Sequence, residues 1–315
     1  MCLLTLAIDR SRRFPLVVAA NRDEFFARPA ARLAWWSPRP DATPILGGRD
    51  LESGGTWLGL TTAGRMAMVT NVRVPGRIDP NAPSRGSIVP EWLAARESPD
   101  RFWMRTALSG FNGFNLIAAD FAGGECWWAS NTAAYPQRLG RGIYGVSNAL
   151  LDTPWPKVLS LKQRTAEAID HAASIDELAG LLFQALADRS AAPDDELPAT
   201  GIPMERERLL SSAFIRTPDQ AYGTRCSTLV ITERTGRHNV THMFERTFSA
   251  HGGLALLRRS MLRNWPPRYN QDESAPAAEP GQVNEAEDHG GDAPPPPPRT
   301  RVRSLLKPPR PPRRR

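Results

Sequence analysis

Two uninterrupted apolar segments open the chain, residues 3–8 and 15–20, with the polar stretch DRSRRF between them. Neither segment alternates with polar residues, which is typical of strands buried on both faces. The pattern therefore predicts a β-hairpin inside a layered structure. Further strands are predicted at TWLGLTT, MAMVTNV, FNLIAAD, ECWWASN and GIYGVSN, and a late hairpin at RCSTLVITE and HNVTHMFE.

Helical patterns occupy the middle of the chain. Ser174 and Glu177 form a capping box ahead of leucines at helical spacing. A second helix is predicted to begin between Pro154 and Pro156 and to continue through Ile169. Two short helices are predicted at 88–95 and 99–108. Strands, then helices, then strands favour an α+β fold in which two antiparallel sheets pack face to face with helices outside.

The end of the chain has a different composition. Thirteen of the 30 prolines lie between Pro266 and Pro312, and apolar periodicity is lost from about Tyr269. We expect a folded domain at 1–265 and a disordered Pro/Arg-rich tail at 266–315. Eight basic and no acidic residues from Arg299 to Arg315 exceed the chain's net charge of +7, so the remainder is close to neutral. A nucleic-acid-binding face on the folded domain is therefore not expected.

The three cysteines, Cys2, Cys126 and Cys226, cannot all pair and form no metal-type cluster. They fit a reducing compartment. No apolar run reaches 18 residues, and the first one ends at Asp9 without a preceding basic residue, which predicts neither a membrane span nor a signal peptide. We expect a cytoplasmic protein.

Cys2 directly follows the initiator methionine. Removal of Met1, which a small second residue favours, would give Cys2 a free α-amino group beside its thiol. An amine with a pKa near 8 can act as general base for a thiol with a pKa of roughly 8.5. The alternative is that Cys2 is only an apolar residue at the start of a buried strand.

Other polar residues are expected near Cys2. Asn21-Arg22-Asp23-Glu24 ends the second strand of the opening hairpin, and antiparallel pairing brings that end beside the first residues of the chain. A guanidinium there would favour the thiolate. Asn71, Asn148 and Arg225 also lie at ends of predicted strands, where asparagine amides can serve as oxyanion donors. Each also has a simpler interpretation, as a turn residue or a surface charge.

Six ordered motifs make the chain recognisable: MC at the start, NRDEFFARP, DLESGGTWLG, TNVR, VSNALLDTPWPKV and YGTRCSTLV. Together they resemble the NRDE family, also called the transport and Golgi organization protein 2 family, over roughly residues 1–250. The resemblance implies an N-terminal nucleophile hydrolase-like fold, a four-layer αββα sandwich, related to cysteine amidases such as penicillin V acylase and bile-salt hydrolase.

The resemblance also implies roles for individual residues. Cys2 would be the nucleophile, with Arg22 and Arg225 near the thiol and Asn148 as oxyanion donor. Asp23 is the expected site acid, although the amidase acid lies further beyond the arginine, and Glu24 is the alternative. Asn71 is a weaker second oxyanion group. Independently of the resemblance, Trp57 is one of several tryptophans that could line an apolar pocket, and we expect it to contact substrate; core packing is the alternative.

Two functions remain open from the sequence. One is an amidohydrolase that cleaves the C–N bond of a small linear or cyclic amide and needs neither metal nor cofactor. The other is a non-catalytic carrier of haem or of a lipid or acyl group in the same pocket. His238 and His242 share a strand face but are expected to be structural. The tail is compatible with binding to an SH3-like groove, to an acidic surface, or weakly to nucleic acid, or with having no partner.

Overall fold

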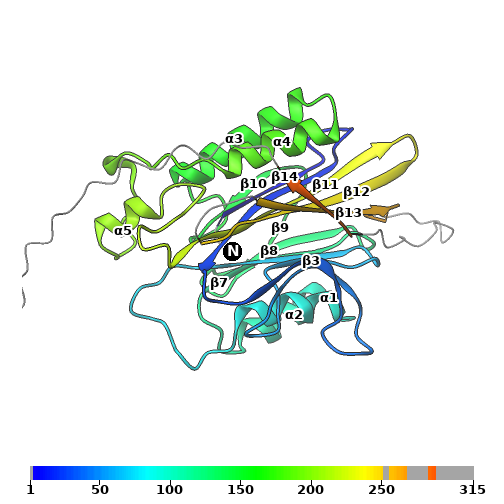
Figure 1. Ribbon diagram of the computed structural model, residues 1–315. Helices are drawn as coiled ribbons and strands as arrows, with labels where there is room; N and C mark the ends of the chain where they lie inside the picture. The colour runs from blue at the N-terminus through cyan, green and yellow to red at the C-terminus, as the bar shows by residue number, and fades with distance from the viewer. Residues whose placement is uncertain (1–2, 251–254, 268–282, 289–315) are drawn as a thin grey trace, which may run out of the picture.

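The computed structural model describes residues 3–250, 255–267 and 283–288. These residues form two antiparallel sheets that pack face to face and carry helices on both outer surfaces (Figure 1). The four-layer αββα arrangement expected from the sequence is therefore confirmed. In spatial order, one sheet contains β10 (Gly142–Val146), β1 (Leu3–Ile8), β2 (Leu16–Phe25), β11 (Tyr222–Thr235), β12 (His238–Thr247), β13 (Ala255–Arg263) and β14 (Val283–Asp288).

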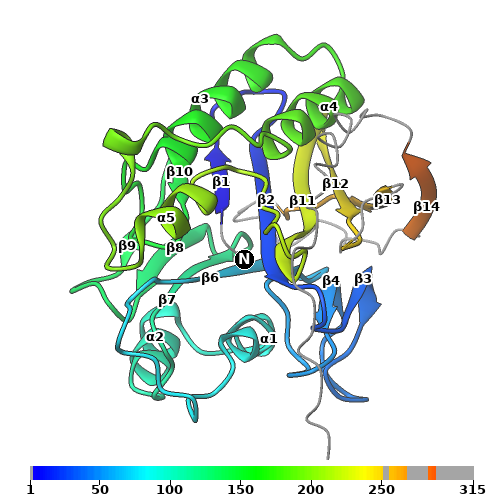
Figure 2. The same cartoon turned by 60° about the vertical axis from the view of Figure 1, so that its left-hand side comes forward.

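The strands of the second sheet lie side by side in chain order. It contains β3 (Ala30–Trp36), β4 (Ile45–Asp50), β5 (Leu58–Leu60), β6 (Arg65–Asn71), β7 (Phe114–Asp120), β8 (Glu125–Ser130) and β9 (Gln137–Arg138). The helices α1 (Ile88–Ala94) and α2 (Pro99–Ala107) cover its outer face, whereas α3 (Pro156–His171) and α4 (Ile175–Leu186) cover the first sheet (Figure 1). The short helix α5 (Met204–Leu209) lies beside the ends of both sheets (Figure 2).

Strand β1 shows how the pleat divides its apolar residues between two cores. Leu4 and Leu6 belong to the cluster between the sheets, whereas Leu3 and Ala7 pack under α3 and α4. Because successive side chains point to opposite faces, a strand buried on both faces needs an uninterrupted apolar run. This confirms the interpretation of residues 3–8.

Helix α4 begins as its capping box predicts. The hydroxyl oxygen of Ser174 accepts a hydrogen bond from the backbone N–H of Glu177 at 3.1 Å, and the Glu177 carboxylate accepts one from the backbone N–H of Ala173 at 2.8 Å. The four longest helices lie within a few residues of their predicted ranges. None of the helices in the described ranges is long and apolar enough to span a bilayer.

One strand lies beyond the boundary expected at residue 265. Val283–Asp288, inside the segment expected to be disordered, forms β14 and pairs antiparallel with β13 from Ala255 to Ser260. In its sequence VNEAED, apolar and polar residues alternate too weakly to predict a strand. Its strand conformation depends on the backbone pairing with β13, a context that the local sequence does not reveal. The remainder of the expected tail, 268–282 and 289–315, lies outside the described residues.

Candidate functional site

The candidate site lies where strands of the first sheet begin and end, and we call this side of the sheet its edge. It brings together the start of β1 and the ends of β10 and β2. Leu3 is the register partner of Asn21, and Leu4 that of Val146. Strand β11 joins the same edge, since Tyr222 to Cys226 pair with the end of β2. The NRDE stretch forms the end of β2, as the sequence predicted. Cys2, the expected nucleophile, lies outside the described residues.

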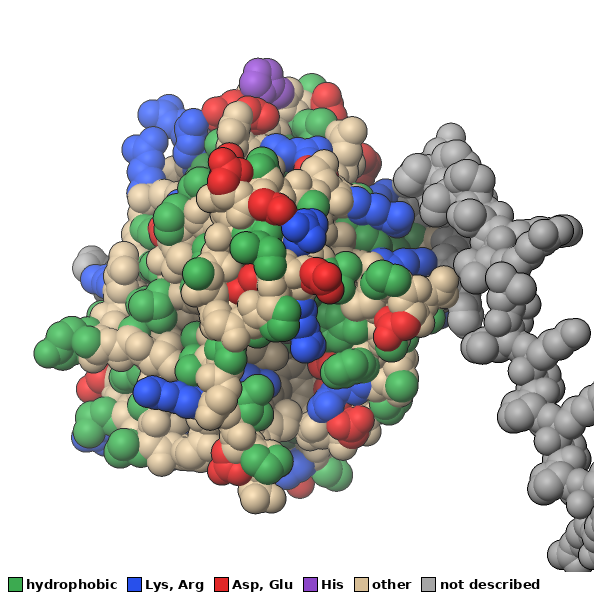
Figure 3. Space-filling view, turned by 90° about the vertical axis from the view of Figure 1, so that its left-hand side faces the viewer, with side chains coloured by type: hydrophobic (Ala, Val, Ile, Leu, Met, Phe, Trp, Pro, Cys, Tyr) green, Lys and Arg blue, Asp and Glu red, His purple; other side chains and the backbone are tan. Residues whose placement is uncertain are grey.

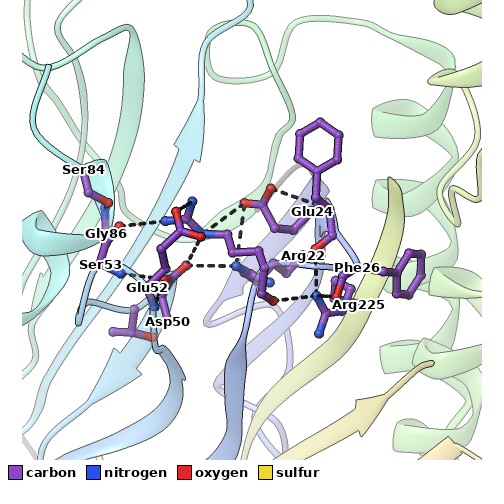
Figure 4. Close-up of polar contacts among 12 residues, drawn as sticks. Arg22, Glu24, Phe26, Asp50, Glu52, Ser53, Ser84, Gly86 and Arg225 are labelled. Atoms are coloured by element: carbon purple, nitrogen blue, oxygen red, sulfur yellow. Dashed lines mark hydrogen bonds and ion pairs between the residues drawn. The ribbon is translucent and has the colours of Figure 1, made fainter. Parts of the chain in front are cut away.

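Arg22 is the centre of the polar cluster at this edge (Figure 4). Its side chain is only 4 % exposed and its guanidinium carbon lies 4.4 Å from the ring centre of Trp57 on the facing sheet. Nη2 donates a hydrogen bond to the Asp50 carboxylate at 3.1 Å. Nη1 is buried and has no hydrogen-bond partner among the described residues. A buried, unused donor on a charged group is costly, so Arg22 has capacity for a further acceptor.

Asp50, at the end of β4, is the carboxylate that holds this arginine, and the sequence did not identify it. Arg28 Nε donates to the same oxygen at 2.7 Å, and the Ser53 N–H donates to the other oxygen at 2.9 Å. Burial acts to raise the pKa of Asp50, but these hydrogen bonds and the charges of Arg28 and Arg22 lower it overall. Asp50 is therefore ionised at neutral pH.

Asp23, the expected site acid, lies on the opposite face of β2 from Arg22. Its Oδ1 accepts a hydrogen bond from the Thr224 hydroxyl at 2.6 Å. The carboxylate of Glu24 lies 3.7 Å from Arg22 Nη2. Of the two alternative acids, Glu24 is thus the one beside the arginine. Successive side chains of a strand point to opposite faces, so Asp23 points away from Arg22.

Asn148 and Asn71 meet across the two sheets, as their predicted strand-end positions suggested. Asn148 Nδ2 donates to the backbone carbonyl of Asn71 at 3.0 Å. The backbone carbonyl of Asn148 accepts a hydrogen bond from the backbone N–H of Arg73 at 2.7 Å. One of the two Nδ2 hydrogens of Asn148 is used in this way. The second is available to a ligand, because a primary amide donates two hydrogen bonds.

Arg225 acts on the backbone of the β2–β3 turn. It sits at the irregularity in β11 between Thr224 and Cys226, and its Nη1 donates to the carbonyls of Phe25, Phe26 and Arg28 at 2.8, 3.1 and 2.9 Å. Burial first, and then the charge of Arg22, lower the pKa of Arg225. The arginine thereby fixes the turn that carries Arg28, the second partner of Asp50.

Cys226 shares a face with Arg22, its register partner, whereas a regular strand would place the thiol on the opposite face. The irregularity at Arg225 shifts the register by one residue and so turns Cys226 inward. Burial raises the pKa of Cys226, and the charge of Glu245 acts in the same direction. This thiol is therefore neutral and a poor nucleophile.

Trp57 lies flat between Arg22 and β4. Gly48 makes this possible, since a Cβ there would collide with the indole ring. Trp57 is 6 % exposed and belongs to the cluster between the sheets, so it supports Arg22 from below. No group of histidine, cysteine or acidic side chains within the described ranges is arranged to hold a metal ion.

The sheets and the Arg22 cluster define an αββα protein with a polar site where its two sheets end. The family model for Transport and Golgi organisation 2 matches residues 1–250. The chain is 33% identical to the Transport and Golgi organization protein 2 homolog of Bos taurus over 287 residues, which cover 85% of this chain and 96% of the relative. The chain belongs to this family, and the resemblance seen in the sequence is confirmed.

Relatives from other animals and two solved structures are also similar. The Homo sapiens homolog is 32% identical over 76% of this chain and 92% of its own, and the Drosophila melanogaster protein 29% over 79% and 93%. A C2A mutant of conjugated bile acid hydrolase from Clostridium perfringens aligns with a TM-score of 0.41 and 11% identity over 79% of this chain and 89% of its own. The Caenorhabditis elegans N-acylethanolamine-hydrolyzing acid amidase ortholog aligns at 0.38 and 13% over 73% and 92%.

Proposed function

We propose that the protein is an N-terminal-cysteine amidohydrolase that cleaves the C–N bond of a small amide, with Cys2 as the nucleophile. The observation that carries the proposal is the buried Nη1 of Arg22, which has no partner among the described residues. Arg22 follows Asn21, the register partner of Leu3. One more step of the same ladder would bring position 2 opposite Arg22.

The alternation of β1 supports the same placement. Leu4 and Leu6 face the space between the sheets, as Arg22 does through its stacking on Trp57. A thiolate next to a buried guanidinium is stabilised, because the opposite charge favours the ionised form. Arg22 would thus hold the nucleophile, while Asp50 and Glu24 hold Arg22.

The reaction balances with groups of this chain and water. The Cys2 thiolate attacks the amide carbon, and its α-ammonium gives a proton to the leaving amine as the C–N bond breaks and a thioester forms. Water, deprotonated by the same amine, then releases the carboxylic acid and restores the thiolate. The unused Nδ2 hydrogen of Asn148 would donate to the oxyanion.

The proposal is tested by screening purified wild-type protein against N-acyl amides of varied acyl length and headgroup. Cys2→Ala should abolish turnover of any amide that the wild type cleaves, while Cys126→Ala should retain it. Cys126 is a buried thiol of β8, outside the cluster, and burial raises its pKa to about 12. Equal turnover by wild type and Cys2→Ala would overturn the proposal.

A second candidate function, binding of a lipid or acyl group without cleavage, is favoured by a different feature. A cavity of about 490 Å³ lies between α2 and the outer face of β7 and β8, and its lining is mostly apolar, including Trp103, Met104, Leu116 and Trp127. Titration with a fluorescent fatty acid tests it. Leu116→Glu should abolish binding while Cys2→Ala leaves it unchanged, and no binding by wild type would exclude this function.

Haem is the other ligand proposed for the carrier alternative, and none of the described histidines is placed as an axial ligand for it. His242 Nδ1 accepts a hydrogen bond from Arg259, and burial and that arginine lower its pKa to about 4. His238 bonds to Asn264, and His171 lies at the end of α3. A haem titration followed by absorbance would test this ligand directly.

A further inference from the structure

A cavity of about 580 Å³ lies beside α5 and the segment that leads into β11. Three arginines and one acid are among its lining residues: Arg189, Arg208, Arg216 and Glu205. Figure 3 views the molecule from the side on which α5 lies, where basic side chains stand at the rim of a hollow. Cavities with uncompensated guanidinium groups are suited to oxyanions, which accept several N–H bonds at once.

The charges in this cavity are unevenly compensated. Arg208 makes two hydrogen bonds to Asp194, at 2.8 and 2.6 Å, and the charge of Glu205 also acts on it. Arg189 and Arg216 have no acidic partner within the described part of the chain. Burial, followed by the charge of Arg189, lowers the pKa of Arg216. Two like charges thus line one cavity, and neither has a counter-ion among the residues that the structure describes.

Aromatic stacking explains how these two arginines are held and leaves part of their donors unused. The guanidinium of Arg189 lies over Phe214 at 4.8 Å and that of Arg216 over Phe26 at 5.9 Å. Arg216 Nη2 donates to the Ser249 carbonyl at 3.0 Å, while its Nε is buried without a partner. A guanidinium stacked through its face keeps its edge N–H groups for a planar or tetrahedral oxyanion.

The cavity adjoins the Arg22 cluster through one aromatic ring. Phe26 has Arg216 at 5.9 Å and Arg225 at 5.3 Å from its ring centre, and the charge of Arg22 acts on Arg225. The backbone joins the two regions as well, because Arg216 pairs with Gly223 just before Arg225. A molecule anchored at Arg189 and Arg216 would therefore lie within one aromatic ring of Arg225.

We propose that Arg189 and Arg216 bind an oxyanion, a carboxylate or a phosphate, carried by the substrate of the neighbouring site. The assignment of this oxyanion to a substrate rests on the proposed amidohydrolase function, whereas the anion site itself does not. The substrate class that follows is an amide whose non-reacting part carries a negative charge.

The test is isothermal titration calorimetry of the full chain at low ionic strength, with inorganic phosphate in one arm and acetate in the other. Arg189→Gln and Arg216→Gln should each weaken binding tenfold or more, and Arg237→Gln, an exposed arginine in the β11–β12 turn, should not. The basic residues after Arg299 are common to all variants and cancel in the comparison. The arm that shows the binding identifies the oxyanion.

Wild-type affinity in both cavity variants, or no binding of either anion by wild type, would overturn the anion site. Arg189 is exposed, so Arg189→Gln keeps the test valid if Arg216→Gln fails to fold. Repeating the titration with Cys2→Ala separates the two proposals. Binding should persist in that variant, and an amide screen without turnover would then refute the hydrolase and leave the anion site standing.

Discussion

At the scale of single residues, one buried guanidinium organises the site. Arg22 is stacked on Trp57, bonded to Asp50 and left with one unused donor. Its carboxylate partner is itself held by Arg28 and by the backbone of Ser53. Removing a member of such a network leaves a buried charge uncompensated, which costs more than the net contribution of the pair.

The first prediction concerns the influence of Arg22 on the nucleophile. Arg22→Gln removes a positive charge beside the proposed thiolate and should raise the pKa of Cys2 by about 1 unit or more. The rate of Cys2 alkylation by iodoacetamide at pH 7, resolved by peptide mass spectrometry, should fall accordingly. Arg49→Gln is the matched control, since Arg49 stacks on Trp36 on the other face of β4. Equal alkylation profiles in all three proteins would contradict the role of Arg22.

The second prediction concerns Glu245, a buried carboxyl between the sheets. Burial raises its pKa to about 7, against the hydrogen bond from the Leu33 N–H and the charges of Arg258 and Arg22. The folded state therefore holds a proton that the unfolded chain releases near pH 4.5. Stability from this proton is complete below that pH and is lost as the pH rises toward 7, on the order of 3 kcal/mol in total.

Glu245→Gln keeps the acceptor for Leu33 and does not titrate. The variant should be more stable than wild type at pH 8, and the difference should shrink toward pH 4. Urea unfolding at several pH values measures this trend. A difference that is constant across the range would show that Glu245 does not titrate in this window.

At the scale of elements, the irregularity in β11 decides which side chains reach the site. Without it, Cys226 and Arg22 would not share a face, and Arg225 would not reach the three carbonyls of the β2–β3 turn. The ranges of strands such as β1 and β7 were predictable, because a local run of apolar residues is enough to indicate a buried strand. The register shift was not predictable, since nothing in YGTRCSTLV distinguishes a regular strand from a bulged one.

The third prediction tests whether Arg225 stabilises the β2–β3 turn, a role we call the turn clamp. Arg225→Gln should weaken the bonds to the carbonyls of Phe25, Phe26 and Arg28 and cost about 2 kcal/mol of stability, since bonds from a charged donor are the strong ones. Amide exchange at Phe26 and Arg28 should quicken, while exchange within α4, which Arg225 does not contact, serves as the control. Unchanged exchange in the turn would contradict the clamp.

The candidate site shows the same limit of prediction. The sequence identified Arg22, Asn71, Asn148 and Arg225 as strand-end residues, and the structure brings them to one edge of the sheets. It did not identify Asp50, whose strand carries two glycines and gives no clear alternation. The sequence could not tell which of Asp23 and Glu24 lies on the face of Arg22, because that depends on how far β2 continues. Pairing with β11 extends β2 to Phe25.

At the scale of the whole molecule, the first sheet depends on residues distant in sequence. β14 pairs with β13 and lies near β3, so it closes an edge that would otherwise expose unpaired backbone groups. Trp265 is fully buried between the sheets and donates to the Thr61 carbonyl at 2.8 Å. Trp265, the last residue of the expected domain, is thus part of the core, and β14 adds one strand beyond it.

The fourth prediction follows from that boundary. Deletion of 289–315 should leave the melting temperature unchanged, whereas deletion of 268–315 removes β14 and should lower it by several degrees. The longer protein is the control for the shorter one, and light scattering would report aggregation through the exposed β13 edge. Equal melting temperatures for the two truncated chains would show that β14 contributes nothing.

The intact mass of the untagged protein is the sharpest test of whether Cys2 acts as an N-terminal nucleophile. We expect Met1 to be absent, so that the amine and the thiol belong to one residue. Retention of Met1 in essentially all molecules would contradict the mechanism, because the amine could not carry the proton. The apolar cavity beneath α2 would then make the carrier function the leading candidate.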